Sequence, residues 1–355
     1  MPPSKILKEH SNQTGSLYLL LLEKKQHETQ VNPQRVVFLD GWRGLAISLV
    51  LISHFLPVKH IDMGRLGVDV FFVLSGMLMS NLLFVKRVKL STFYKRRISR
   101  IIPVFVLFVS SVYLASYILG DYQESSNYLY TLFFMRSYVP GPHIWLSGMP
   151  IGHLWSLNVE EHCYIILSLL TLLSFLKNKG YIPILMIGAG SVLLNYLYFK
   201  YPSYSTNHYD VKTEIVASHL MLSAGYFLIK DRVARFIPVG APLVTLLLSI
   251  MCYLNEAPWY ASWLISPFLL AFTVNHLNLM PKAIKTILEF KPLCMLGTWA
   301  FSIYLWQQPL YFFGVKNGSA FYLAGPVLLI ASILIGKFSF HFFEEPARKY
   351  INNKW

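Results

Sequence analysis

Apolar stretches about as long as a lipid bilayer is thick recur along this chain and limit the folds open to it. A helix needs about 20 apolar residues to cross a hydrocarbon core of about 30 Å. Ten stretches have this character, at 36–58, 66–85, 101–119, 153–176, 181–199, 212–229, 236–254, 259–277, 292–314 and 321–342. The sequence therefore predicts an all-α fold, a polytopic membrane helix bundle of about ten transmembrane helices.

The composition agrees with a membrane protein. Only 14% of the residues are charged and 55% are apolar, whereas soluble domains carry about 25% charged residues. The net charge of +14 would indicate nucleic-acid binding if the basic residues gathered on a soluble face. They lie instead between apolar stretches, so we expect no nucleic-acid partner. The three cysteines have neither metal-ligand nor disulfide spacing, and no bound metal is expected.

The distribution of lysine and arginine predicts the orientation of the bundle. With the N-terminus inside the cell, 23 of the 31 basic residues fall in inner segments, 6 in outer segments and 2 within spans. Cytoplasmic loops carry such an excess, so both termini are predicted to be cytoplasmic. We expect a polar tail over 1–34, a transmembrane domain over 35–343 and a short tail over 344–355. The segment 128–138 is too short to span and is expected to be interfacial or re-entrant.

Ionisable residues in the first two spans are the first candidates for function. Arg43 and His54 are eleven positions apart, which places them on one helix face and about 16 Å apart along the axis. Folding the chain at the turn after the first span brings Asp69 to the depth of His54. A carboxylate beside a histidine fixes the ring tautomer and makes the free nitrogen a better base. The alternative is that these groups are polar contacts that hold helices together.

Two further groups of charged residues stand at the third and fourth spans. Arg96, Arg97 and Arg100 begin the third span and could bind the phosphates of a nucleotide, a phospholipid headgroup or coenzyme A. The alternative is an anchor that sets topology. Glu160 and Glu161 are adjacent, so their side chains point about 100° apart and at most one faces a given cavity.

A set of motifs occurs in order along the chain. It comprises FLDGWRGLA at 38–46, SHF at 53–55, GVDVFFVLSGML at 67–78, FYKRRISRIIP at 93–103, HLWSLNVEEHCY at 153–164, LGTWAFSIYLWQQPLY at 296–311 and FFEEPARKY at 342–350. Together these motifs resemble the acyltransferase-3 family of bacterial integral-membrane O-acyltransferases. The resemblance covers about residues 36 to 350, which is nearly the whole chain.

The chain also departs from the family pattern. Gln307 stands where many relatives have a histidine, which weakens any role for this position in proton transfer. His162 and Cys163 replace a common Gln-Phe pair. Many relatives carry a soluble esterase-like domain after the last helix, and we expect none here.

The resemblance implies transfer of an acyl group, most commonly acetyl, from cytoplasmic acyl-coenzyme A to a hydroxyl of an extracytoplasmic glycan or lipid-linked sugar. It places the protein in the bacterial cytoplasmic (inner) membrane. The predicted site consists of catalytic Arg43, His54, Asp69 and Glu160, donor-binding Arg96, Arg97 and Arg100, and substrate-binding His153, Trp155 and Ser156. His54 would act as a general base or form an acyl intermediate, and the sequence leaves both mechanisms open.

Two other classes of protein compete with an enzyme. A transporter or flippase would move an acyl donor or a lipid-linked sugar without chemistry, and broken helices in paired halves would indicate it. No such pair is visible in the sequence. A structural partner of a polysaccharide assembly complex would not need Arg43 and His54 on one face. The expected partners of an acyltransferase are membrane lipid, acyl-coenzyme A, the glycan acceptor and polysaccharide assembly proteins.

Overall fold

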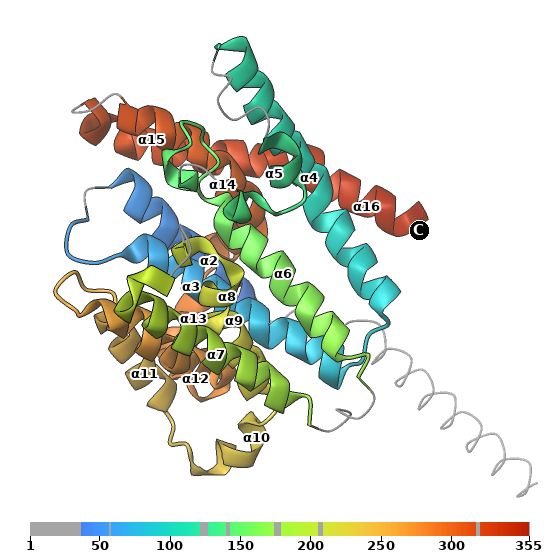
Figure 1. Ribbon diagram of the computed structural model, residues 1–355, viewed down its shortest axis with the longest axis vertical. Helices are drawn as coiled ribbons and strands as arrows, with labels where there is room; N and C mark the ends of the chain where they lie inside the picture. Colours follow the sequence, from blue (N-terminus) through green and yellow to red (C-terminus); the bar gives the residue numbers. More distant parts are fainter. Residues whose placement is uncertain are drawn as a thin grey trace, which may run out of the picture. The chain divides into compact units, whose positions relative to one another are not determined.

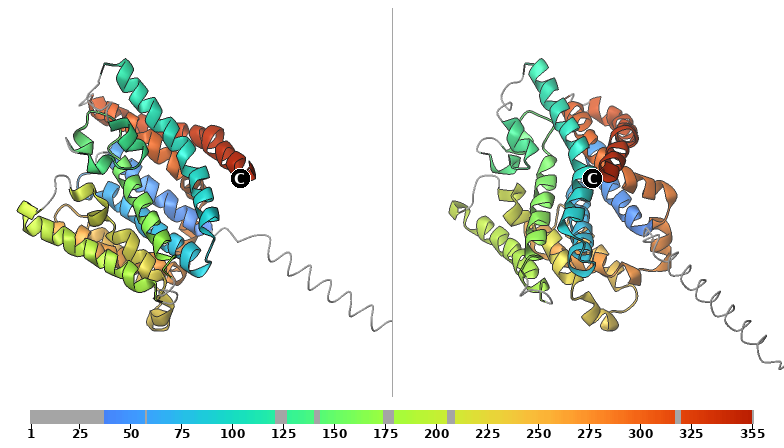
Figure 2. Two further views of the ribbon diagram at one scale, coloured as in Figure 1. Left: turned by 45° about the vertical axis from the view of Figure 1, so that its right-hand side comes forward. Right: turned by 90° about the vertical axis from the view of Figure 1, so that its right-hand side faces the viewer.

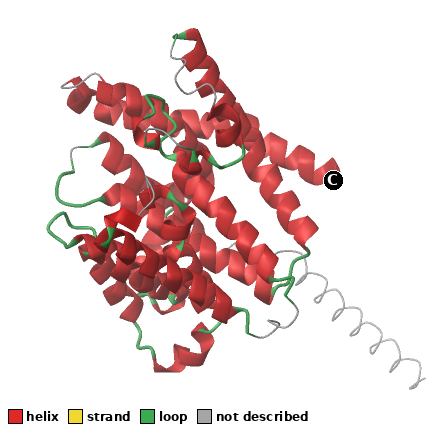
Figure 3. Ribbon diagram, in the orientation of Figure 1, coloured by secondary structure: helices red, strands yellow, loops and turns green. Residues whose placement is uncertain are grey.

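The structure, a computed structural model, is helical throughout its described part. It describes residues 37–56, 58–120, 127–139, 143–173, 179–204, 209–316 and 320–354. Within these ranges every regular element is a helix, and a single isolated β-bridge joins Ile61 to Leu254 (Figure 3). The chain divides into two units, 1–37 and 38–355. Everything reported below lies in the second unit, apart from Val37 at the start of the first described helix. The predicted tail over 1–34 lies outside the described residues.

Every predicted span contains helix (Figure 1). The corresponding elements are α2 (Val37–Phe55), α3 (Met63–Ser80) with η1 (Asn81–Val85), α4 (Leu90–Ile118), α6 (Leu154–Leu170), α7 (Tyr181–Lys200), α8 (Thr213–Val216) with α9 (Ser218–Phe227), α11 (Ala241–Met251), η9 (Ala261–Ile265) with α12 (Ser266–Asn275), α14 (Lys291–Lys316) and α15 (Ala320–Ser339). The segment 128–138 forms only α5 (Tyr128–Leu132) and η3 (Arg136–Tyr138), which are too short to span, as predicted.

Fewer helices meet the criteria for a membrane span than the sequence predicts. Among the described residues five are long and apolar enough, or six if the bent pair 230–236 and 241–251 counts as one. Several helices at predicted spans are shorter. One of them, α9, is buried from Ser218 to Gly225 and packs against α3, α7 and α12. A helix at the centre of a bundle faces protein on all sides, so it needs neither the length nor the apolar surface of a lipid-facing helix. The described chain is a multi-pass membrane protein with a partly polar interior.

Short elements complete the chain. These are η4 (Ile144–Leu146), η6 (Pro202–Tyr204), η7 (Tyr209–Val211), α10 (Lys230–Val233), η8 (Ala234–Phe236), η10 (Leu277–Leu279), α13 (Lys282–Leu288), η11 (Phe340–Glu344) and α16 (Glu345–Lys354). The predicted C-terminal tail is therefore helical. Its helix α16 lies beside the first part of α4 (Figure 2).

The helices α2 and α14 approach each other closely through glycines. A Cβ atom added at Gly44 would overlap the carbonyl oxygen of Leu293, and one added at Gly297 would overlap the carbonyl oxygen of Asp40. Small residues allow such close contact between membrane helices. The contact brings α2, which carries Arg43 and His54, directly against α14.

A seam between α4, α6 and α14 forms a separate part of the core. Its buried side chains are apolar and mainly aromatic or branched, including Val104, Phe105, Phe108, Leu154 and Leu305. At the end of this seam nearer the start of α4, charged residues replace the apolar ones. That end of the seam contains the candidate site.

Candidate active site

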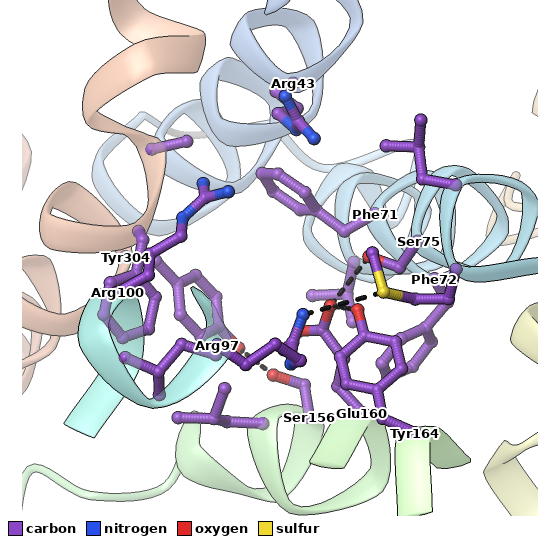
Figure 4. A pocket seen from close by; sticks show the side chains of 17 residues that line it. Arg43, Phe71, Phe72, Ser75, Arg97, Arg100, Ser156, Glu160, Tyr164 and Tyr304 are labelled. Atoms are coloured by element: carbon purple, nitrogen blue, oxygen red, sulfur yellow. Dashed lines mark hydrogen bonds between the residues drawn. The ribbon is translucent and has the colours of Figure 1, made fainter. Parts of the chain in front are cut away.

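One cavity of about 130 Å³ gathers polar side chains from five helices (Figure 4). They are Arg43 from α2, Ser75 from α3, Arg97 and Arg100 from α4, Ser156, Glu160 and Tyr164 from α6, and Tyr304 from α14. Apolar side chains, among them Phe71 and Phe72, form the rest of the wall. Five of the predicted site residues therefore share one cavity, although they come from three parts of the sequence.

Two of the three arginines in the cavity have carboxylate partners. Arg43 pairs with Asp40 on the same helix, at 3.1 Å between Nη1 and Oδ1. Arg97 pairs with Glu161, at 2.6 Å between Nη2 and Oε1, and its guanidinium lies 3.6 Å above the ring of Tyr164. These contacts hold both cations in place at the cavity wall.

Arg100 differs from the other two. No carboxylate of the described chain lies within ion-pair distance of its guanidinium, although the charge of Glu344 acts on it from farther away. Arg100 also faces the charge of Arg43 (Figure 4). Two cations that share a poorly solvated space repel each other. An anionic ligand would relieve this repulsion, and a planar guanidinium suits phosphate in particular. The cavity is therefore suited to an anionic or strongly polar ligand.

Glu160 is the carboxylate that faces the cavity. Its Oε1 accepts hydrogen bonds from the Ser75 hydroxyl at 2.7 Å and from the Tyr164 hydroxyl (Figure 4). Glu161 is not part of the cavity wall, in agreement with the helical geometry of adjacent residues. In the described ranges no group of three or more His, Cys, Asp or Glu side chains is arranged to hold a metal ion.

Hydroxyl groups link α6 to α14 at the cavity wall. The Ser156 and Tyr304 hydroxyls lie 2.6 Å apart, and Tyr304 also donates to the backbone carbonyl of His153 at 2.9 Å. The His153 ring is not part of the wall and packs between Phe108 and Tyr304, at centroid distances of 5.5 and 5.1 Å. Ser156 is thus the predicted substrate-binding residue that reaches the cavity.

Two other predicted residues lie away from the cavity. Trp155 is 6% exposed and packs against Phe72, with the guanidinium of Arg65 at 5.4 Å from its ring centroid. Arg96 is exposed at the start of α4, and its neighbours in sequence, Arg97 and Arg100, reach the cavity without it. Arg96 and Arg100 are one helical turn apart on α4, yet only Arg100 lines the cavity.

His54 lies about three helical turns along α2 from Arg43 and outside the cavity wall. Its Nδ1 is 2.7 Å from Oε1 of Gln307, and its ring stacks on Tyr311 at a centroid distance of 4.3 Å. Both partners come from α14, so the close contact between α2 and α14 fixes the position of the imidazole.

The predicted pairing of His54 with Asp69 is wrong. Asp69 is fully buried and bonds instead to Arg65 and Tyr253, each at 2.8 Å, with His219 at 3.5 Å. Folding the hairpin predicts the depth of a residue but not the direction in which its side chain points. Asp69 faces α9 and the chain around α12, whereas His54 faces α14.

Several residues at these sites were not singled out from the sequence. Ser75, Tyr164 and Tyr304 line the cavity, and each lies within a motif quoted above without standing out as a charged residue would. Gln307 departs from the family pattern, and it is the hydrogen-bond partner of His54. The glutamine at a position where many relatives have a histidine is the sequence feature that points to this role.

This chain is similar to known acyltransferases. The profile of a family described as an acyltransferase domain matches residues 36–340. The peptidoglycan O-acetyltransferase OatA of Listeria monocytogenes is 27% identical over 90% of this chain. The O-acetyltransferase OatA of Staphylococcus aureus strain NCTC 8325 is 26% identical over 92% of it. The chain spans 57% and 59% of the lengths of these two relatives. No solved structure matches.

Proposed function

The chain belongs to this family of membrane acyltransferases, and on that premise we propose that it transfers an acetyl group from cytoplasmic acetyl-coenzyme A to a hydroxyl of a cell-wall glycan. The relatives are named O-acetyltransferases, and the first of them acts on peptidoglycan by its name. The observation that carries the proposal for this chain is the cavity in which Arg43, Arg97 and Arg100 meet Glu160. It combines cations for an anionic donor with a half-buried carboxylate.

The donor occupies the cavity at the start of α4. A volume of about 130 Å³ is small beside the roughly 300–1,000 Å³ of pockets that enclose a whole ligand, so only part of coenzyme A enters. Arg100 binds a phosphate because no carboxylate of the described residues lies within ion-pair distance of its guanidinium. Arg43 sits across the cavity and binds the same anionic region.

The acceptor reacts near His54. Arg43 and His54 are about 16 Å apart along α2, so a donor held at the arginines must extend its thioester along the helix. His54 takes the proton of the acceptor hydroxyl, and the oxygen attacks the thioester carbonyl carbon. The carbon–sulfur bond then breaks, an ester forms, and coenzyme A leaves as a thiol after taking up the proton.

The proposal includes an orientation. We place ten spans in the cytoplasmic membrane with both termini inside, which puts the start of α4 on the coenzyme A side. The excess of 23 inner over 6 outer basic residues supports this arrangement. Single cysteines at 59 and 200 should react with an impermeant thiol reagent from outside, and one at Lys89 should not. Labelling of position 89 from outside would place the arginine cavity on the wrong side for coenzyme A.

A thioester assay with purified protein tests the proposed activity. The protein in nanodiscs receives acetyl-coenzyme A and a soluble peptidoglycan fragment, and the free thiol and the acetylated glycan are quantified together. We expect equal amounts of both products, and neither with the His54→Ala variant. Consumption of thioester without glycan acetylation would show that the peptidoglycan fragment is not the acceptor. Transport of the donor or the glycan without thioester consumption would show that the protein is a transporter and not an enzyme. An acetylated His54 trapped in the absence of acceptor would replace direct transfer by a covalent route.

A further inference from the structure

We infer that Gln307 is a positioning residue that holds His54 in one tautomer, with Nε2 as the basic nitrogen. The inference rests on the proposed role of His54 in acyl transfer. Gln307 is fully buried in α14, where the close contact with α2 brings it to His54. A buried amide with defined partners on both its oxygen and its nitrogen can determine where a neighbouring ring carries its proton.

The orientation of the Gln307 amide follows from its other contacts. Its Nε2 lies 3.4 Å from the main-chain carbonyl oxygen of Tyr304 and 3.2 Å from Oε1 of Gln308. A main-chain carbonyl oxygen can only accept a hydrogen bond, so the group that faces it must be the amide NH₂. The amide oxygen of Gln307 therefore points toward His54.

The proton position on His54 follows from this orientation. An amide oxygen has no hydrogen to donate, so Nδ1 of His54, at 2.7 Å, must carry the proton. In a neutral imidazole the other nitrogen then has a free lone pair. Tyr311 stacks on the ring with only 16° between the planes, which opposes rotation of the imidazole out of this hydrogen bond. Nε2 is left as the nitrogen that can take a proton.

This arrangement gives an amide the orienting role that the sequence assigned to Asp69. When Nε2 accepts the proton of the acceptor hydroxyl, the imidazolium keeps its Nδ1–H bond to Gln307. The amide is neutral, so it orients the ring without placing a second charge in the membrane interior. The departure from the family pattern at position 307 thus preserves a hydrogen-bond acceptor for His54.

Substitutions at position 307 separate orientation from packing. Gln307→Leu removes the acceptor at nearly constant size, whereas Gln307→Glu and Gln307→His each retain an acceptor atom. The control is Asn195→Leu in α7, because Asn195 is also a buried amide at 3% exposure and contacts neither His54 nor Gln307. We expect Gln307→Leu to lower kcat by about 100-fold with KM for acetyl-coenzyme A changed less than about twofold. Gln307→His should recover activity to within about tenfold of the unchanged protein, and Asn195→Leu should lose less than about threefold.

A spectroscopic measurement tests the tautomer without any turnover. Protein labelled with ¹⁵N-histidine in nanodiscs is studied by solid-state NMR, and the His54 signals are identified by their loss in His54→Gln. We expect Nδ1 protonated and Nε2 unprotonated in the unchanged protein, and a mixture of tautomers in Gln307→Leu. A protonated Nε2 in the unchanged neutral protein, or undiminished kcat in Gln307→Leu, would overturn the inference. Absence of acetyl transfer by the unchanged protein would instead reject the proposed function and leave the tautomer measurement interpretable.

Discussion

The hydroxyl groups of Ser156 and Tyr304 lie 2.6 Å apart and join α6 to α14 at the wall of the arginine-lined cavity. Tyr304 reaches a second acceptor, the backbone carbonyl of His153, at 2.9 Å. One turn further along α14, Gln307 contacts His54. A single helix therefore contributes to both the donor cavity and the position of the base.

We expect Tyr304→Phe to weaken the contact between α6 and α14 without leaving a cavity in the core. The variant removes both hydrogen bonds of the Tyr304 hydroxyl, although the Ser156 hydroxyl keeps its hydrogen bond to the backbone carbonyl of His153 at 3.1 Å. We expect a loss of about 1 kcal/mol in the free energy of unfolding. Thermal unfolding of the purified protein in detergent measures the effect. Tyr226→Phe serves as a control for loss of a tyrosine hydroxyl, because Tyr226 bonds to His276 far from the cavity. Equal activity and stability of Tyr304→Phe and the unchanged protein would show that the link is dispensable.

Arg100→Ala should weaken donor binding because it removes the cavity cation that has no carboxylate within ion-pair distance in the described chain. We expect KM for acetyl-coenzyme A to rise about tenfold, as for loss of a charge-assisted hydrogen bond. The difference between variant and unchanged protein should shrink as salt rises. Arg96→Ala is the matched control, since Arg96 lies on the same helix but is exposed. If both variants raised KM equally, the effect would come from the overall positive charge at the start of α4 and not from a specific contact of Arg100.

The sequence predicted the helices well because apolar length is a local property. Ten helical regions occur where ten were predicted, and Arg43, Arg97, Arg100 and Glu160 do share a cavity. The number of spans was harder to predict because a central helix such as α9 is surrounded by protein. The length and polarity of α9 depend on the helices packed around it. Those helices cannot be identified from the sequence of α9 alone.

The partner of His54 could not be predicted from the hairpin alone. Depth in the membrane follows from counting residues at 1.5 Å each, but the direction of a side chain depends on how the helix is rotated against its neighbours. That rotation is set by packing over long sequence distances. The glycine contact between α2 and α14 brings Gln307, 253 positions away in the sequence, to His54.

Gly297→Ala tests the packing that positions the base. The added methyl group meets the main-chain carbonyl of Asp40, and the backbone there cannot yield without moving α2. We expect a loss of about 1–3 kcal/mol in stability and lower activity per folded molecule. Gly190→Ala in α7 is the control because open space surrounds that position and its backbone is helical. A larger loss at position 190 than at 297 would contradict close packing of α2 on α14.

Asp69→Asn should act on stability more than on chemistry. The carboxylate neutralises Arg65, whose guanidinium also lies 3.9 Å from the ring centroid of Trp263. Removal of one partner of a buried ion pair costs about 3–5 kcal/mol, and the lower end applies because the Arg65 side chain is 17% exposed. We expect reduced abundance in the membrane, with nearly normal kcat for the molecules that fold. Normal abundance with lost turnover would return Asp69 to the catalytic residues.

The enzyme proposal depends most on His54. We expect His54→Ala to remove acetyl transfer while the protein still inserts and binds acetyl-coenzyme A. The reason is spatial, since His54 is not part of the cavity wall and lies about 16 Å along α2 from Arg43. Loss of a general base typically lowers the rate by about 10²–10⁴-fold.

Binding and turnover must therefore be measured on the same preparation of His54→Ala. Donor affinity from equilibrium dialysis should match that of the unchanged protein, while glycan acetylation by mass spectrometry should fall to background. His60→Ala is a suitable control because His60 is an exposed histidine near the same end of α2. Lost donor binding together with lost abundance would identify His54 as a packing residue between α2 and α14. Retained binding without product would identify it as the group that activates the acceptor, because no step before proton removal requires the imidazole.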